Sequence, residues 1–146
     1  MLGTLLQSWR FWALLSAGFA ALTAILAKVG VTGVNPDVAT FVRTVVILAL
    51  TGAILFASGQ APGLGTLSAR STGFLVASGL ATGASWLCYF RALALGDAAR
   101  VAPLDKLSVV LVAILGVTLL GETLTLPNWI GVALIAAGAV LVAYRG

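Results

Sequence analysis

Two ionisable side chains lie inside long apolar stretches of this sequence and have the most obvious chemical potential. Arg43 lies eight residues after Asn35, and Asp105 lies eight residues after Asp97. Asn and Asp are common helix N-caps, and eight helical residues rise about 12 Å, so Arg43 and Asp105 are expected at equal depth along two helices. An Arg–Asp ion pair between these helices would satisfy both charges.

Three further basic residues are expected on the same side of the protein. Lys106 follows Asp105 directly, while Lys28 and Arg91 lie near the ends of two other apolar stretches. Four basic groups around one carboxylate favour binding of a solute that carries a carboxylate or phosphate. The alternative is that Lys28, Arg91 and Lys106 extend to lipid headgroups, and that the Arg43–Asp105 pair is only structural.

Uncharged polar side chains share one helical face with the spacing i, i+4, i+7 and i+11: Ser78, Thr82, Ser85 and Tyr89. Thr44 adjoins Arg43, and Trp86 adjoins Ser85. Together these residues predict the lining of a water-accessible pocket. The alternative is that the hydroxyls bond to their own helix backbone or join helices, and that Trp86 faces lipid.

The composition decides the class of protein. The 146 residues include 8 basic and 4 acidic side chains and are 61% hydrophobic, which is too few polar groups to cover a soluble domain. With no His, imidazole chemistry is excluded, and with Cys88 as the single cysteine, disulfides and thiolate zinc sites are excluded. Since no Ser–Lys or paired-carboxylate arrangement stands out, we expect a membrane protein that is not an enzyme, with no cofactor, metal or nucleic-acid partner.

Five apolar stretches are long enough to cross a bilayer as helices: 12–31, 36–57, 72–95, 98–120 and 127–144. They are continuously apolar, which favours helices over barrel strands, and turn residues separate them. We therefore predict an all-α membrane protein with one five-helix domain over residues 1–146. Pro103 is expected to kink the fourth span beside Asp105.

Five spans place the termini on opposite sides of the membrane. The basic residues divide almost evenly between the two sides of the membrane. The positive-inside rule therefore only slightly favours an orientation with the amino terminus outside. Such a balance is compatible with insertion in both orientations.

Several stretches carry a family resemblance: AALTAILAK at 20–28, Arg43-Thr44, GLATGASWLCYFRAL at 79–93, PLDKLSVV at 103–110 and LGETLT at 120–125. With these residues the chain resembles the EamA family, the five-helix unit of the drug/metabolite transporter superfamily. It is similar in particular to short single-unit transporters of bacteria and archaea. The charged Asp105-Lys106 departs from the uncharged sequence common there in two-unit members, so their substrates are not carried over.

The resemblance implies transport of small metabolites across a prokaryotic inner membrane. Larger relatives carry two such units in opposite orientations, so a single unit is expected to form a homodimer, plausibly antiparallel. We expect a secondary transporter of a small polar, anionic or zwitterionic metabolite, working by alternating access, with Asp105 as the proton-coupling group. The alternative is a membrane assembly factor that binds a partner protein and transports nothing; a channel ranks third.

Overall fold

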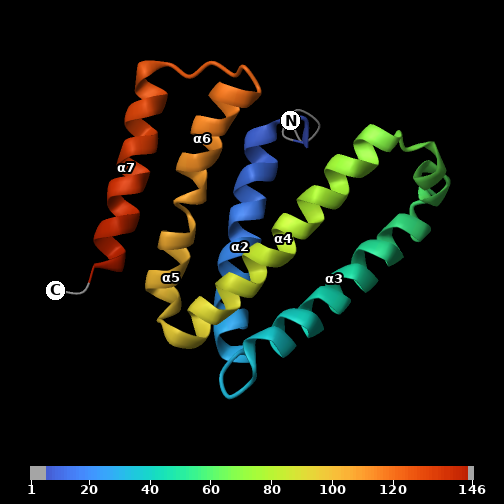
Figure 1. The fold of residues 1–146 in the computed structure, drawn as a ribbon, viewed down its shortest axis with the longest axis horizontal. Helices are drawn as coiled ribbons and strands as arrows, with labels where there is room; N and C mark the ends of the chain where they lie inside the picture. Colours follow the sequence, from blue (N-terminus) through green and yellow to red (C-terminus); the bar gives the residue numbers. More distant parts are fainter. Residues whose placement is uncertain (1–5, 145–146) are drawn as a thin grey trace. The chain divides into compact units, whose positions relative to one another are not determined.

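The computed structural model describes residues 6–144, and these fold into helices that match the five expected spans. The spans are α2 (Trp9–Gly30), α3 (Pro36–Ala57), α4 (Ala69–Leu95), the pair α5 (Ala98–Asp105) and α6 (Ser108–Leu119), and α7 (Leu126–Ala143). Each is apolar and long enough to cross a bilayer, with α5 and α6 together forming the fourth span. Figure 1 shows the order of these helices along the chain. The prediction of an all-α membrane protein with five transmembrane helices is confirmed.

Large apolar side chains are exposed along every span, among them Leu14, Phe41, Leu80, Leu111 and Leu141. A soluble protein of this size would bury such residues in a core, whereas side chains that face acyl chains have no reason to be buried. Exposed apolar side chains along every helix are what a lipid-embedded protein presents.

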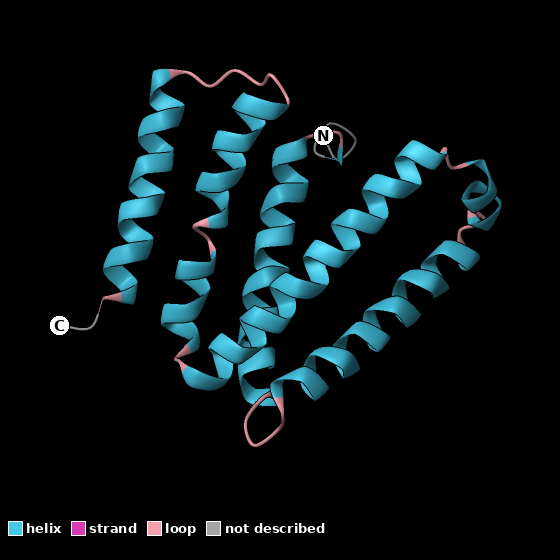
Figure 2. Ribbon diagram, in the orientation of Figure 1, coloured by secondary structure: helices cyan, strands magenta, loops and turns pink. Residues whose placement is uncertain are grey.

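The chain divides into two compact units. One consists of residues 1–28 and 95–146, and in it α7 packs against both α5 and α6. The other, residues 29–94, is a helical hairpin in which α3 and α4 run in opposite directions and are joined by the short 3₁₀ helix η1 (Ala61–Thr66), as Figure 2 shows.

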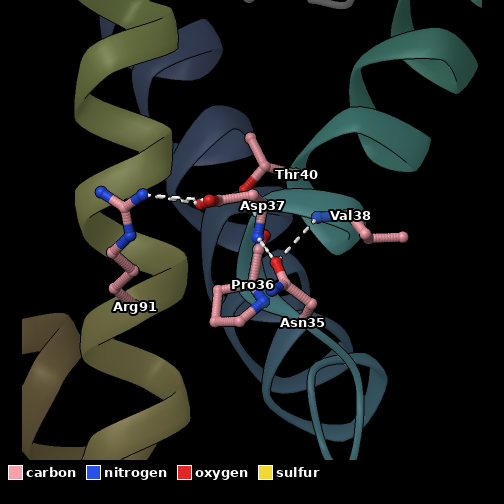
Figure 3. A network of polar contacts seen from close by, with 6 residues as sticks. All are labelled: Asn35, Pro36, Asp37, Val38, Thr40 and Arg91. Atoms are coloured by element: carbon pink, nitrogen blue, oxygen red, sulfur yellow. Dashed lines mark hydrogen bonds and ion pairs between the residues drawn. The ribbon is translucent and has the colours of Figure 1, made fainter.

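The start of α3 follows the pattern that its sequence predicts. The Asn35 side-chain Oδ1 accepts hydrogen bonds from the backbone N–H of Asp37 at 2.8 Å and of Val38 at 3.4 Å (Figure 3). Pro36 occupies the first turn, where its missing N–H leaves no helical bond unmade. This cap fixes where the helix begins and therefore how deep Arg43 lies along it.

The start of α5 differs from the expectation in one detail. Asp97 is the N-cap residue in an extended conformation, but its side chain accepts no cap hydrogen bond. Its backbone carbonyl instead accepts from the N–H groups of Arg100 and Val101, both at 2.9 Å. The boundary was predicted correctly, and the predicted capping interaction was wrong.

The corner before α7 depends on a glycine. Gly121 has a φ of +69°, a left-handed conformation that L side chains rarely adopt. The backbone N–H of the next residue, Glu122, donates a hydrogen bond to the Gly116 carbonyl at 3.1 Å, at the C-terminal end of α6. α7 then starts at a capping pair in which the Thr125 N–H donates to Asn128 Oδ1 at 2.9 Å.

Candidate functional site

Arg43 lies in α3 and stacks on aromatic rings of α4. Its guanidinium carbon is 4.3 Å from the centroid of the Trp86 ring and 5.5 Å from that of Phe90. Trp86 and Phe90 are four residues apart and therefore share a helix face, and Phe90 is buried. A cation over such rings gains roughly 0.5–2 kcal/mol, more where water is excluded. Trp86 is thus a platform for Arg43, a role that its sequence neighbourhood did not reveal.

Arg91, also on α4, forms an ion pair that the sequence analysis missed. Its Nη2 donates to both carboxylate oxygens of Asp37, at 2.9 and 3.0 Å (Figure 3). Asp37 lies in the first turn of α3, where a carboxylate is also favoured by the helix dipole. The sequence contained a signal for this pair. In an antiparallel hairpin the start of one helix and the end of the next lie at the same level, so Asp37 and Arg91 could be expected near each other.

The two lysines of the predicted basic cluster, Lys28 and Lys106, belong to the unit of residues 1–28 and 95–146, and each has a partner within that unit. The Lys28 ammonium donates to the carbonyl oxygen of Gly96 at 2.9 Å. Lys106 Nζ lies 3.4 Å from Asp105 Oδ2, so this carboxylate pairs with its sequence neighbour. Asp105 and Arg43 belong to different units, and an ion pair between them stays a prediction.

The hydroxyl groups behave largely as the structural alternative predicts. Thr44 donates to the Thr40 carbonyl at 2.8 Å, and Thr82 donates to the Ser78 carbonyl at 2.9 Å, each within its own helix. Ser78, Thr82 and Ser85 lie on an exposed part of α4, and Tyr89 is partly buried. Thr44 and Thr82 therefore have their donors occupied, and a pocket lined by these residues stays a prediction.

The fourth span is interrupted beside Asp105, but not where the proline rule alone would put the break. Pro103 is inside α5, and the helix stops at Lys106 and Leu107 before α6 resumes at Ser108. Around the break, hydrogen bonds close after three residues, as from Leu107 N–H to the Leu104 carbonyl at 3.1 Å and from Val109 N–H to the Lys106 carbonyl at 3.0 Å. This tight turn places a carboxylate and an ammonium at a discontinuity of a membrane-spanning helix.

The chemistry open to this arrangement is recognition of charge. Within residues 6–144, no three His, Cys, Asp or Glu side chains gather to hold a metal ion. What the described chain offers instead is a guanidinium on an aromatic platform, two ion pairs and an interrupted helix.

Comparison with known proteins agrees with a transport role. The family model described as "EamA-like transporter family" matches residues 7–144. This chain belongs to the EamA-like transporter family. A Sinorhizobium protein named "Uncharacterized transporter in cobO 3'region" is 66% identical over 137 residues, which cover 94% of this chain and 97% of that protein. No solved structure matches significantly.

Membership in the EamA-like family confirms the resemblance drawn from the sequence. Together with five apolar helices it makes the chain an integral, multi-pass membrane protein embedded in lipid. The family and the Sinorhizobium relative are transporters by name, which identifies the chain as a membrane transporter rather than an enzyme.

Proposed function

We propose that this EamA protein is a secondary transporter that moves a small polar metabolite by alternating access, as a homodimer in the inner membrane of a prokaryote. Family membership over residues 7–144 supports transport, and the relative from Sinorhizobium supports a bacterial setting. Since the sequence has no phosphate-binding glycine loop for ATP, solute or ion gradients would supply the driving force.

The observation that carries the proposal is the position of Arg43. It lies eight residues past the cap of a membrane-spanning helix, about 12 Å along the helix axis. A charge at that depth costs roughly 2.5–3.5 kcal/mol on insertion scales, and such residues commonly mark solute or ion pathways. Arg43 is therefore the residue expected to meet the transported solute.

Proton coupling is assigned to Asp105. Its carboxylate lies at the end of α5, next to the interruption and in contact with Lys106. Interrupted helices in secondary transporters commonly carry the coupling group. Protonation of Asp105 would remove its negative charge and release Lys106 from the ion pair.

The dimer follows from the size of the unit. Alternating access needs two halves that move against each other around a site, and transporters of this kind often use inverted repeats. A chain with five spans supplies one half. A second copy in the opposite orientation would supply the other half, in agreement with the near-even distribution of basic residues.

The proposal is tested with purified protein. A panel of anionic, zwitterionic, cationic and neutral metabolites is screened for thermal stabilisation, because a ligand that binds only the folded state raises its apparent stability. Solutes that stabilise are then used in counterflow with proteoliposomes. Saturable counterflow is expected. A protein that moves no panel solute, and that is recovered only in complex with another membrane protein, would instead be an assembly factor; non-saturating flux would identify a channel.

A further inference from the structure

We infer that Arg43, held on Trp86, binds the carboxylate of a small organic monoanion, and that this is the class of solute transported. The inference rests on the proposed transport function and adds to it a ligand chemistry. The residues involved all lie in the α3–α4 hairpin.

The contact of Arg43 with Trp86 does not depend on the N–H donors of the guanidinium. A cation–π contact is made by the positive charge, so the five N–H donors are not required for it. The Arg43 guanidinium carbon lies over the Trp86 ring, 4.3 Å from its centroid. The planar fork matches a carboxylate, which accepts two parallel hydrogen bonds from it.

The same stacking reduces the conformational cost of binding. A free Arg side chain loses rotamer freedom when a ligand fixes it, and this loss opposes binding. Contacts with two rings of α4 already restrict Arg43 before a solute arrives. A pre-organised donor fork of this kind is suited to recognising one anionic group.

The charge balance of the hairpin indicates a monoanion. Residues 29–94 contain three basic side chains, Arg43, Arg70 and Arg91, and one acidic side chain, Asp37. Asp37 is paired with Arg91, and Arg70 lies in the first turn of α4, close to η1. Counted by itself, the membrane-spanning part of the hairpin therefore carries one positive charge without an acidic partner in the hairpin, that of Arg43. A monocarboxylate balances it, whereas a dianion would leave a negative charge uncompensated in lipid surroundings.

The surroundings favour a ligand with an apolar body. Trp86 is only partly buried and presents hydrocarbon surface next to the guanidinium. A carboxylate that carries an alkyl or aryl group would place its charge on Arg43 and its apolar part against the accessible part of this ring. Inorganic phosphate would use only the charge.

Trp86 also provides the measurement. In a chain with Trp9, Trp12 and Trp129 replaced by Phe, Trp86 is the single tryptophan and its fluorescence reports on the ring beneath Arg43. The purified protein is titrated with acetate, butyrate and benzoate, with their neutral amides, and with succinate and inorganic phosphate. We expect saturable changes with monocarboxylates and none with the amides.

Variants identify the group that binds. Arg43→Gln is expected to raise the Kd for the best monocarboxylate at least about tenfold, since a hydrogen bond to a charged group is lost. Arg43→Lys keeps the charge but not the planar fork, and it should also weaken binding, which keeps the inference testable if the Gln variant does not fold. Arg70→Gln, the matched loss of an arginine at the far end of the same hairpin, should bind as the parent does.

The inference is overturned if no monocarboxylate changes Trp86 fluorescence, if amides act as well as acids, if only succinate or phosphate responds, or if Arg43→Lys and Arg43→Gln bind as tightly as the parent. Its failure differs from failure of the proposed function. Saturable counterflow of a cation or a dianion would overturn the monocarboxylate site alone, whereas carboxylate binding without counterflow would overturn transport alone.

Discussion

The guanidinium Nη2 of Arg91 contacts both carboxylate oxygens of Asp37, at 2.9 and 3.0 Å, and so joins the end of α4 to the first turn of α3. The two side chains are 55% and 53% exposed, so the ion pair is expected to contribute less than about 1 kcal/mol. It lies where the two helices meet, about one turn from Thr40 and about two turns from Arg43 along α3.

We predict that Asp37→Asn and Arg91→Gln each lower the apparent melting temperature in detergent by a small amount, and that the double variant loses no more than the larger single effect. The reason is that either substitution already breaks the ion pair. Arg70→Gln serves as the control and should leave the melting temperature unchanged. Additive losses in the double variant would show that the two residues do not stabilise the hairpin through each other.

The cap of α3 should carry more free energy than the ion pair. Asn35→Ala removes the acceptor for the N–H groups of Asp37 and Val38 and should cost about 1 kcal/mol, while Asn35→Asp keeps an acceptor and should cost little. Hydrogen exchange at these two amides is the direct measurement, with faster exchange expected only in the Ala variant. Equal exchange in the Ala and Asp variants would contradict the cap.

We predict that replacing Gly121, in the turn after α6, lowers the stability of the protein more than replacing a glycine inside a helix. Gly121→Ala should destabilise the protein by about 1 kcal/mol, because Gly121 has a φ of +69°. Gly52, inside α3, has open space where a Cβ would be added, so Gly52→Ala should be neutral or slightly stabilising. Thermal unfolding of the two variants side by side tests this, and an equal response at both positions would show that backbone conformation is not the cause.

Much of this architecture could be predicted from sequence because its causes are local. Span length follows from apolar runs, and the start of α3 follows from Asn35 and Pro36 within a few residues of chain. The start of α5 at Asp97 could also be predicted. Whether the Asp97 carboxylate caps the helix depends on its surroundings in the folded chain, which the sequence alone does not give. Pro103 indicated a discontinuity, and the hydrogen bonds at Lys106 and Leu107 decided where it fell.

The candidate site was less predictable because it depends on contacts between helices. Counting residues from the helix N-caps predicts that Arg43 and Asp105 lie at the same depth. The count does not say which faces of the helices contact each other. The partners that the structure gives within each unit, Trp86 for Arg43 and Lys106 for Asp105, follow from helix rotation and from chain neighbourhood. The ion pair of Asp37 with Arg91 also joins two helices, and it is not among the contacts predicted from the sequence.

The coupling role of Asp105 predicts a separation of two activities. Asp105→Asn should abolish solute uptake driven by a proton gradient in proteoliposomes, because the amide cannot take up and release a proton. Solute–solute counterflow, which needs no net proton movement, should be retained. Proton-driven uptake that is unchanged in Asp105→Asn would exclude this carboxylate as the coupling group.

The antiparallel dimer predicts two orientations of one chain. With Cys88→Ala as background, a cysteine at Gln60, in the exposed connection after α3, should react with an impermeant maleimide in intact cells for roughly half of the molecules. The cysteine-free chain is the control. Complete labelling, or none before the membrane is opened, would mean a single orientation and would contradict the antiparallel arrangement.

The role of Arg43 in transport is tested by counterflow of the best-stabilising solute through proteoliposomes that contain the parent chain, Arg43→Lys or Arg70→Lys. We expect saturable counterflow in the parent and in Arg70→Lys, and a loss of at least about tenfold in kcat/KM in Arg43→Lys, because a lysine on the Trp86 platform lacks the planar donor fork. Counterflow by Arg43→Lys at the parent's rate and KM would contradict it.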